Sequence, residues 1–363
     1  MADQLLFSIL LFLVCFFSWG GSRLIAYFAS HLGLVHTPNM RSSHSSVTPH
    51  GGGVAIVVFV SIAFFILQLN FSEFEEGYSL NEFYVVMALA FLLAVMGLLD
   101  DVFHLSVGLR LLVQLFVVSG LFYSLKGTAN TDVVSDYIFF AFLVLAGAWW
   151  INLYNFMDGI DGIAAVEALC VLSMAIVISF FYDYSAQNFF VWQFMLLVAA
   201  AIAGFLMSNW PPAKVFMGDV GSTWVAFILL AVALLSIEQG LLSSSVWIIL
   251  VASFVVDTTV TLLVRIARKE KWYSPHRNHL YQIMTIRWQA QLNAINSDEN
   301  ACRTMAHRKA ICYLLLINFL WLAPLACLSL YFPALAFVII AVAYLPLIIA
   351  VLWFGIGRRI VFR

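Results

Sequence analysis

Residues 83–101 read FYVVMALAFLLAVMGLLDD, and this stretch decides the class of fold. Residues 83–99 carry no charge, and two adjacent carboxylates, Asp100 and Asp101, follow directly. An uncharged run of this length, as a helix, is just long enough to cross the hydrocarbon core of a bilayer. A charge in the middle of a bilayer costs roughly 2.5–3.5 kcal/mol on insertion scales and less near the interface. The stretch therefore predicts a transmembrane helix whose acidic end lies near the membrane surface.

The composition extends this interpretation to the whole chain. Of the 363 residues, 64% are hydrophobic and 10% are charged, whereas a soluble domain carries roughly 25% charged residues. Only a surface that faces lipid can accommodate so much apolar area with so few charges. The net charge of -2 gives no indication of nucleic-acid binding. None of the five cysteines lies in a C-x-x-C motif, so neither a disulfide framework nor a zinc site is expected.

We therefore predict an all-α integral membrane protein with about eleven transmembrane helices in one polytopic domain over residues 1–363. The predicted spans are 5–28, 51–69, 83–99, 109–125, 136–154, 162–182, 189–208, 221–238, 244–264, 310–331 and 334–354. The first run has neither a basic start nor an A-x-A cleavage pattern, so we expect a retained helix rather than a signal peptide. The longest polar stretch, 265–309, is expected to be a loop.

Basic residues give the orientation, because Lys and Arg accumulate in cytoplasmic loops. The loops predicted on one side are 29–50, 100–108, 155–161, 209–220 and 265–309, together with the tail 355–363. These loops and the adjoining helix ends hold every Lys and Arg except Lys126. That side is predicted to be cytoplasmic, which places the N-terminus outside and the C-terminus inside.

Two further acidic motifs lie in the loops of the predicted cytoplasmic side. Residues 152–162 read NLYNFMDGIDG and contain Asn155, Asp158 and Asp161. A calcium loop is the nearest alternative, but the spacing does not fit an EF-hand. Residues 209–222 read NWPPAKVFMGDVGS, in which Asp219 precedes a predicted helix whose N-terminus would favour an anion. Solvated helix ends, structural turns and an ordinary N-cap are the simpler explanations of each motif taken alone.

Two basic segments frame these acids. Residues 37–53 read TPNMRSSHSSVTPHGGG, which has the composition of a phosphate-cradling loop but not the P-loop pattern. Residues 265–282 read RIARKEKWYSPHRNHLYQ, and taken singly these charges are explained by the cytoplasmic bias of basic residues. Clustered carboxylate oxygens suit magnesium or manganese better than zinc. Magnesium bridging phosphates beside arginines recurs in phosphoryl transfer, and no hydrolase motif competes with this interpretation.

These motifs, in order over residues 38–282, resemble the polyprenyl-phosphate N-acetylhexosamine-1-phosphate transferases (glycosyltransferase family 4). Within that family they are most similar to the bacterial enzymes that initiate O-antigen or related surface polysaccharide. The resemblance implies that a UDP-N-acetylhexosamine gives its sugar 1-phosphate to undecaprenyl phosphate and that UMP leaves. It implies a Mg²⁺ cofactor, with Mn²⁺ as the alternative, and a cytoplasmic-face site in the bacterial inner membrane. No nucleic-acid partner is expected, and a homodimer is left open.

The resemblance also assigns roles. Asp100 and Asp101 match the acidic pair of the family, and Asp219 matches its magnesium-binding aspartate, with Asp100 or Asp101 assisting. The match to the N-x-x-D-G-x-D-G motif gives Asn155 as substrate-binding and Asp158 and Asp161 as catalytic. The remaining assignments are Phe216 for stacking on uracil, with Asn209 nearby, His279 as catalytic, and Arg41, His44, Arg110, Arg265, His276 and Arg277 as substrate-binding.

The chain departs from the family in several places. Gly108 stands where the family often has a lysine, which leaves Arg110 as the expected phosphate contact. His50 stands where the family often has an arginine before the glycines that begin at Gly51. The H-x-H-H motif reads His279-Leu280-Tyr281-Gln282, with His276 upstream as a substitute. Residues about 288–304 resemble an insertion. These departures affect what the resemblance implies about the donor sugar and the basic loops. GlcNAc, GalNAc and a deoxy-amino sugar all stay open as the sugar that is transferred.

The acceptor is already a phosphate with a second pKa near 6, so catalysis should depend mainly on screening its charge. One member of the acidic pair could remove the last acceptor proton, and a covalent phospho-aspartate stays open. A secondary transporter would require inverted repeats and broken helices, and neither is evident in the sequence. A non-catalytic scaffold is disfavoured because the acidic positions of the motifs are all present. Asp257 lies inside a predicted span, and two roles stay open for it: a functional role, or a hydrogen bond in helix packing.

The orientation can be tested with reporter tags in loops 70–82 and 265–309. We expect the acidic loop 70–82 outside and the basic loop 265–309 in the cytoplasm, because basic residues resist translocation. Protease protection of each tag in intact and opened spheroplasts measures this. Finding both tags on one side would contradict the predicted number of spans between them.

Overall fold

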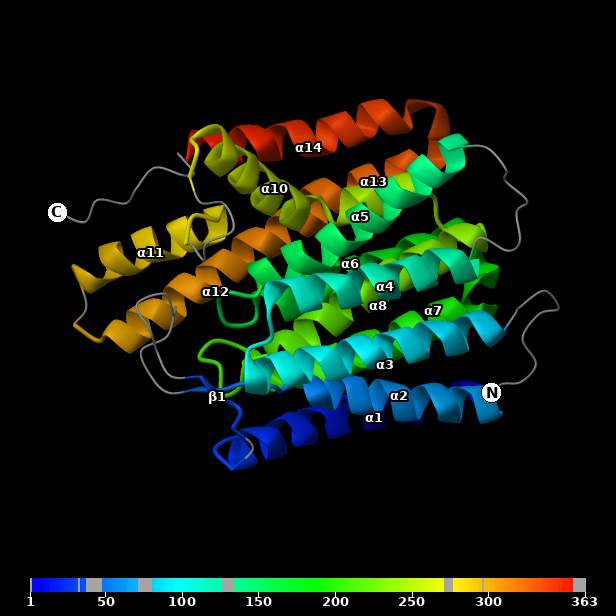
Figure 1. Cartoon of the computed structure of the whole chain (residues 1–363), viewed down its shortest axis with the longest axis horizontal. Helices are drawn as coiled ribbons and strands as arrows, with labels where there is room; N and C mark the ends of the chain where they lie inside the picture. The colour runs from blue at the N-terminus through cyan, green and yellow to red at the C-terminus, as the bar shows by residue number, and fades with distance from the viewer. Residues whose placement is uncertain are drawn as a thin grey trace.

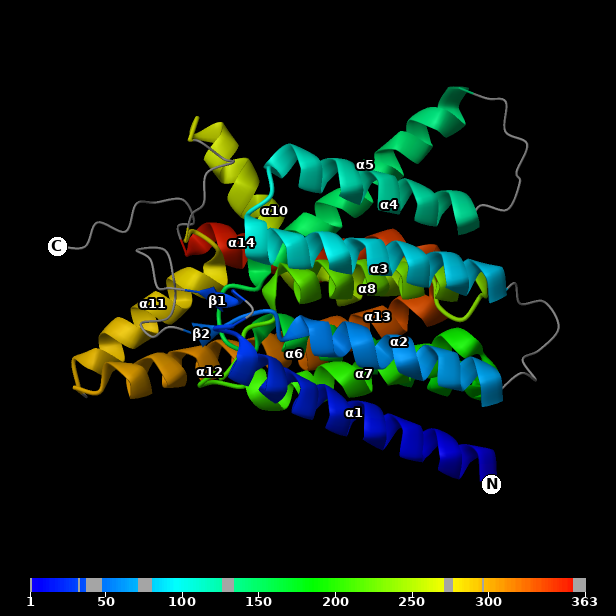
Figure 2. The same cartoon turned by 60° about the horizontal axis from the view of Figure 1, so that its bottom comes forward.

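The computed structural model describes residues 2–31, 33–36, 48–70, 80–125, 134–270, 277–295 and 297–354. Long helices lie side by side in one bundle, with most of their axes close to the long axis of the molecule (Figures 1 and 2). Apart from one antiparallel pair of short strands, the described chain is helical or in turns. The all-α prediction is therefore confirmed.

The first half of the chain contributes α1 (Ala2–Phe28), β1 (Val35–His36), β2 (Thr48–Pro49), α2 (Gly53–Asn70), α3 (Leu80–Phe103), α4 (Val107–Leu125), α5 (Val134–Met157) and α6 (Ile163–Tyr182). The second half contributes η1 (Tyr184–Asn188), α7 (Phe190–Asn209), α8 (Gly218–Glu238), α9 (Ser244–Leu250), α10 (Ala252–Ala267) and α11 (Leu280–Asn293). The chain then continues through α12 (Glu299–Ile317), the π-helical turn η2 (Asn318–Leu322), α13 (Ala323–Tyr331), η3 (Pro333–Leu335) and α14 (Ala336–Trp353).

Each predicted span lies largely on helical residues. Among the described residues, nine helices are long and apolar enough to cross a membrane, and the bent pair α9–α10 raises the number to ten. Residues Gly53–Leu69 of α2 form a further apolar helix that is shorter. The protein is thus an all-α integral membrane protein.

Two expectations about the second half of the chain were wrong. Segment 244–264 is not one straight span, because α9 and α10 meet at an angle of 66°; Val251 between them leaves the helical region with a ψ of 4°. The polar stretch 265–309 is not mainly a loop, since it contains α11 and the first part of α12. The side chain of Asp298 accepts hydrogen bonds from the backbone N–H groups of Asn300 and Ala301 and so caps α12.

Two helices form the centre of the bundle and others face outward. Nearly all of α6 and α8 is buried, whereas α1 and α14 expose large apolar side chains such as Phe12 and Phe337. A helix that is apolar all round is stable only inside a protein or against lipid. The central position of α8 matters for the site, because its first turn is surrounded by α2, α3 and α5.

Close backbone approach at the start of α8 requires glycine. A Cβ on Gly53 of α2 would lie 2.3 Å from the Cα of Gly221, and a Cβ on Gly97 of α3 would lie 2.6 Å from the Cα of Val220. Both distances are too short for any side chain. The glycines at these positions therefore let α2 and α3 pack directly on the first turn of α8.

The loops of the predicted cytoplasmic side gather at one end of the bundle. There β1 pairs with β2 in the register Val35↔Pro49, and the N–H of Phe216 donates to the carbonyl of Pro49 over 2.8 Å. The same end holds the α3–α4, α5–α6 and α7–α8 connections and the α11–α12 hairpin (Figure 1). The described parts of the motifs recognised in the sequence are thus brought to one place.

Candidate active site

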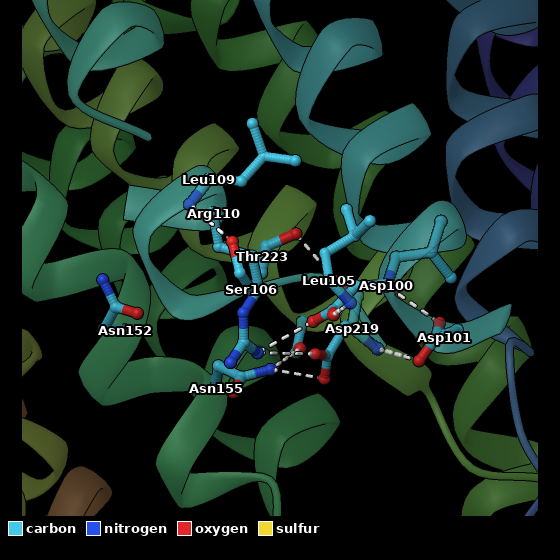
Figure 3. Close-up of polar contacts among 12 residues, drawn as sticks. Asp100, Asp101, Leu105, Ser106, Leu109, Arg110, Asn152, Asn155, Asp219 and Thr223 are labelled. Carbon is cyan, nitrogen blue, oxygen red and sulfur yellow. Dashed lines mark hydrogen bonds and ion pairs between the residues drawn. The ribbon is translucent and has the colours of Figure 1, made fainter. Parts of the chain in front are cut away.

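The acidic pair at the end of α3 divides into two different environments. Asp100 accepts a hydrogen bond from the N–H of Leu105 at its Oδ1 (2.7 Å) and from the guanidinium of Arg110 at its Oδ2 (2.8 Å). Only 5% of Asp100 is exposed. Arg110 lies on α4, so this ion pair also fixes the tight connection between α3 and α4 (Figure 3).

Asp101 points to the start of α8. Its two carboxylate oxygens accept the backbone N–H groups of Asp219 (3.0 Å) and Val220 (3.2 Å). The first backbone N–H groups of a helix have no partner within the helix, and a carboxylate there is favoured by the helix dipole. Nε2 of His50 lies 3.9 Å from Oδ1 of Asp101. Asp101 therefore serves as the cap of α8, supplied from another helix.

Asp219 is the point at which four helices meet. Its Oδ1 accepts a hydrogen bond from Nδ2 of Asn155 on α5 (2.9 Å), and its Oδ2 lies 3.6 Å from NH1 of Arg110. The carboxyl groups of Asp100 and Asp219 lie within hydrogen-bonding reach of each other. Two carboxylates, an amide and one guanidinium thus converge from α3, α4, α5 and α8 (Figure 3).

The two asparagines of the NLYNFMDGIDG motif point to different neighbours. Asn155 also donates to the Oγ of Ser222 (2.8 Å), so its amide is directed at the first turn of α8. Asn152 instead exchanges hydrogen bonds with Gln114 on α4, and it lies apart from the acidic cluster (Figure 3). The structure therefore favours Asn155, not Asn152, as the site residue.

Asp158 and Asp161 follow α5 in one turn but differ in charge. Burial, and then the negative charges of Asp101 and Asp161, raise the pKa of Asp158 to about 7. Burial also acts to raise the pKa of Asp161, but His307, the N–H of Ala213 and the charge of Arg303 together outweigh it. The net pKa of Asp161 is therefore below its ordinary value. The turn carries one carboxyl that titrates near neutrality and one that stays ionised.

Asn209 ties the Asp158–Gly162 turn to the loop that carries Phe216. Its Oδ1 accepts the N–H of Gly162 (3.0 Å), and its Nδ2 donates to the carbonyl of Val215 (2.9 Å). Phe216 is half-buried, and its backbone is held between β2 and Gly52. The structure places Asn209 as a connection between two site loops, with both ends of its amide engaged.

The basic residues are distributed less tightly. Arg41, His44 and His276 lie outside the described residues. Arg110 joins the acidic cluster, whereas the Nε of Arg265 lies 3.7 Å from Oε2 of Glu270 near the end of α10. Arg277 is half-buried, and burial lowers its pKa.

His279 lies beside a different carboxylate. Its Nδ1 is 3.6 Å from Oδ1 of Asp257, and Asp257 accepts the N–H groups of Leu280 (2.8 Å) and Tyr281 (3.2 Å) at the start of α11. Of the two roles left open for Asp257, the structure therefore supports helix packing. Tyr281, in the position of a family histidine, donates its hydroxyl to the carbonyl of Phe156 (3.2 Å), next to the Asp158 turn.

Sequence reasoning missed two residues of α12 that contact the site loops. Nδ1 of His307 lies 3.3 Å from Oδ2 of Asp161. Arg308 donates from Nε and NH2 to the carbonyl of Pro211 (3.1 and 2.9 Å). The available signal was a histidine and an arginine at the polar start of a long apolar helix. Arg308 was counted only among the basic residues of the cytoplasmic side, and His307 was not considered.

A buried carboxyl away from the site was also missed. Glu167 on α6 accepts hydrogen bonds from Ser253 (2.6 Å), just after the α9–α10 bend, and from Asn318 (2.7 Å) at the π-helical turn. The two oxygens thus join α6 to two distorted segments. This contact stabilises the bundle and does not touch the acidic cluster.

The donor set suits a magnesium ion held mainly by its substrate. Among the described residues, no group of three or more His, Cys, Asp or Glu side chains is arranged to hold a metal ion. Mg²⁺ is commonly bound by one or two carboxylates, with substrate phosphates and water supplying the other ligands. Asp219 and Asp100, which already converge on one cationic side chain, fit that mode.

The fold and the site together define a polytopic membrane protein with an acidic, arginine-bearing site where its helices end. Residues 83–237 match the family model described as glycosyl transferase family 4. The chain is 28% identical over 269 residues, 70% of each chain, to the probable undecaprenyl-phosphate N-acetylglucosaminyl 1-phosphate transferase of Bacillus subtilis (strain 168).

Two further relatives fall in the same group. Identity is 29% over 274 residues, 70% of each chain, with the undecaprenyl-phosphate alpha-N-acetylglucosaminyl 1-phosphate transferase of Escherichia coli (strain K12). It is 26% over 239 residues, 61% of this chain and 68% of the relative, with the phospho-N-acetylmuramoyl-pentapeptide-transferase of Clostridium botulinum (strain Eklund 17B / Type B). Over these ranges the chain is similar to polyprenyl-phosphate hexosamine-1-phosphate transferases, and the family model that it matches is that of glycosyl transferase family 4.

The raised pKa of Asp158 predicts a pH dependence of stability. An unfolded aspartate titrates near pH 3.9, so between that pH and about 7 the folded protein holds a proton that the unfolded chain has lost. Stability should therefore fall as the pH rises through this window. We expect the melting temperature in detergent to decrease between pH 5 and 8, and Asp158→Asn to reduce that decrease.

Asp183→Asn is the matched control for this measurement. The side chain and backbone of Ser185 donate to Asp183 and lower its pKa, so it titrates below the window. The control should keep the wild-type dependence. An equal decrease in wild type and Asp158→Asn would show that Asp158 does not titrate near neutrality.

Proposed function

We propose that this protein transfers an N-acetylhexosamine 1-phosphate from a UDP-sugar to undecaprenyl phosphate and releases UMP. The observation that carries the proposal is the convergence of Asp100 and Asp219 on the guanidinium of Arg110, with the amide of Asn155 donating to Asp219. Such a cluster can hold a divalent cation and a phosphate together, which is the main requirement of phosphoryl transfer. The names of the relatives support the sugar-phosphate and the polyprenyl-phosphate substrates.

The position of the cluster suits a lipid acceptor. Asp100 and Asp101 lie in the last turn of α3, and Asp219 lies in the first turn of α8, so the acids lie where apolar helices end. The phosphate of a membrane-anchored polyprenyl chain lies at the interface between lipid and water. An acceptor phosphate can thus reach the cluster while its tail stays in the bilayer.

The nucleotide would bind beside the second group of site residues. Phe216 offers a half-buried ring, and its loop is joined to the Asp158–Gly162 turn through Asn209. Stacking on an aromatic ring is a general way to hold a base. We propose that uracil stacks on Phe216, so that the diphosphate extends toward Arg110 and Asp219.

Asp219, with Asp100, would hold Mg²⁺, and the ion would screen the phosphate charges of donor and acceptor when bound. Arg110 supplies a fixed positive charge beside the same carboxylates. Asp101 is committed to the N-terminus of α8. Asp158 accepts no hydrogen bond that the structure describes, and its pKa of about 7 suits a group that takes a proton at neutral pH. We therefore propose Asp158, rather than Asp101, as the base for an acceptor that still carries its last proton.

The orientation of the basic loops supports a site on the cytoplasmic face of a bacterial inner membrane. Cytoplasmic loops are enriched in Lys and Arg, and the cluster lies at the end to which those loops belong (Figure 1). The O-antigen pathway and a homodimeric assembly stay predictions. The bent pair α9–α10 was not expected, and broken helices occur in transporters; the acidic cluster, however, is separate from that bend.

The first test is release of UMP by purified protein supplied with undecaprenyl phosphate and a panel of UDP-sugars. Activity should disappear in chelator and return with magnesium or manganese. Asp219→Ala should lose more than roughly tenfold in turnover, because a hard cation loses a charged oxygen ligand. Asp183→Ala, at a carboxylate outside the cluster, should keep wild-type turnover. Full activity in chelator would contradict the metal-dependent mechanism.

The second test concerns Phe216. Phe216→Ala should raise the KM for the UDP-sugar about tenfold or more, since stacking on a base contributes roughly 1–3 kcal/mol. The KM for undecaprenyl phosphate should change little. Phe216→Tyr keeps the ring and should retain the wild-type KM. An unchanged nucleotide KM in the alanine variant would mean that the ring only packs against its own loop.

A further inference from the structure

The polar first half of α12 is attached to the site, although it comes from the other end of the sequence. His307 is buried, with 3% of its surface exposed. The helix continues from these polar residues into the apolar stretch that ends at Tyr331. A buried histidine at this position needs a polar partner, because unpaired buried polar groups are destabilising.

The partner of His307 is Asp161, the second aspartate of the N-x-x-D-G-x-D-G motif. The Oδ2 of Asp161 lies 3.3 Å from Nδ1 of His307 and also accepts the N–H of Ala213 over 3.1 Å. One carboxylate oxygen is thus shared between α12 and the loop before Phe216. Asp161 is 8% exposed, which leaves little of it to contact a substrate.

The neighbouring residue makes a second connection to the same loop. Arg308 donates two hydrogen bonds to the carbonyl of Pro211. Together with Asn209, which joins Gly162 to Val215, these contacts hold the Asp158–Gly162 turn and loop 211–217 against each other and against α12. The turn carries Asp158, and the loop carries Phe216.

We infer that His307 is a positioning residue: by holding Asp161 against loop 211–217, it fixes the spacing between Asp158 and Phe216. This inference rests on the proposed function, in which Phe216 holds the nucleotide and Asp158 lies beside the acceptor. His307 touches neither substrate. It acts through Asp161, whose carboxylate joins structural elements and does not take part in the reaction.

Two amide substitutions separate the contact at Nδ1 from the rest of the ring. In His307→Asn the amide nitrogen can take the place of Nδ1, so the contact with Asp161 should be restored. In His307→Gln the amide nitrogen instead corresponds to Nε2 and is displaced from Asp161. A hydrogen bond to a charged group is commonly worth a factor of about ten or more in an equilibrium constant.

We expect His307→Gln to raise the KM for the UDP-sugar about tenfold, with kcat reduced much less, because the spacing of binding groups changes and the acidic cluster does not. His307→Asn should return the KM toward that of wild type. His31→Gln, at an exposed histidine after α1, serves as the control and should match wild type. Equal KM values for wild type and His307→Gln would overturn the inference.

A measurement that needs no substrate keeps the inference separate from the proposed function. Melting temperatures of His307→Leu, Asp161→Asn and the double variant form a cycle, and interacting residues give non-additive changes. We expect the double variant to melt close to the less stable single variant. Additive shifts would overturn the contact even if UMP is released. If wild type releases no UMP but the cycle is non-additive, the proposed function fails, while the contact between His307 and Asp161 is confirmed. A leucine variant that does not fold is replaced by His307→Gln in the same cycle.

Discussion

The carboxylate of Asp101 accepts the backbone N–H groups of Asp219 and Val220, and this contact fixes the start of α8 against the end of α3. The first turn of α8 is packed against other helices, so its backbone N–H groups need a partner within the protein. Supplying the cap from another helix solves that problem and at the same time brings two acidic motifs into contact. Gly97, one turn before the acidic pair, allows the backbones of α3 and α8 to approach closely enough for it. The remaining site groups are arranged around this contact.

Clustering of negative charge at the site is balanced by the fixed positive charge of Arg110, which lies between Asp100 and Asp219. At the neighbouring turn, Nδ1 of His307 lies 3.3 Å from Oδ2 of Asp161. Like charges at short range oppose ionisation, so each of these carboxylates needs a cation or a hydrogen-bond donor. Asp158 is the exception, and its pKa of about 7 shows the consequence. A site in which one carboxyl titrates near neutrality while its neighbour stays ionised can exchange a proton and keep its geometry.

Several contacts could not be foreseen, for reasons that differ. Asp257 lies in the middle of a predicted span, and only the position of α11 shows that it caps that helix. Asn209 was expected near the uracil, but both ends of its side-chain amide are hydrogen-bonded to other loops. The α9–α10 bend was missed because neither proline nor glycine marks it in the sequence; Glu167 and Ser253 are hydrogen-bonded beside it. Side-chain pairs between helices far apart in the chain leave no periodic signal.

The sequence alone determined the membrane class, the places of the helices and the residues of the acidic motifs. Uncharged runs long enough to cross a bilayer allow few alternatives, and several acidic motifs on the same predicted side indicated a common site. Tertiary structure decided which carboxylate does what: Asp101 caps α8, Asp219 meets Arg110, and Asp161 is held by His307. These roles depend on distances between side chains that the chain brings together only when it folds. Hydropathy fixes where a helix lies in the membrane, but it does not fix which face of that helix meets which neighbour.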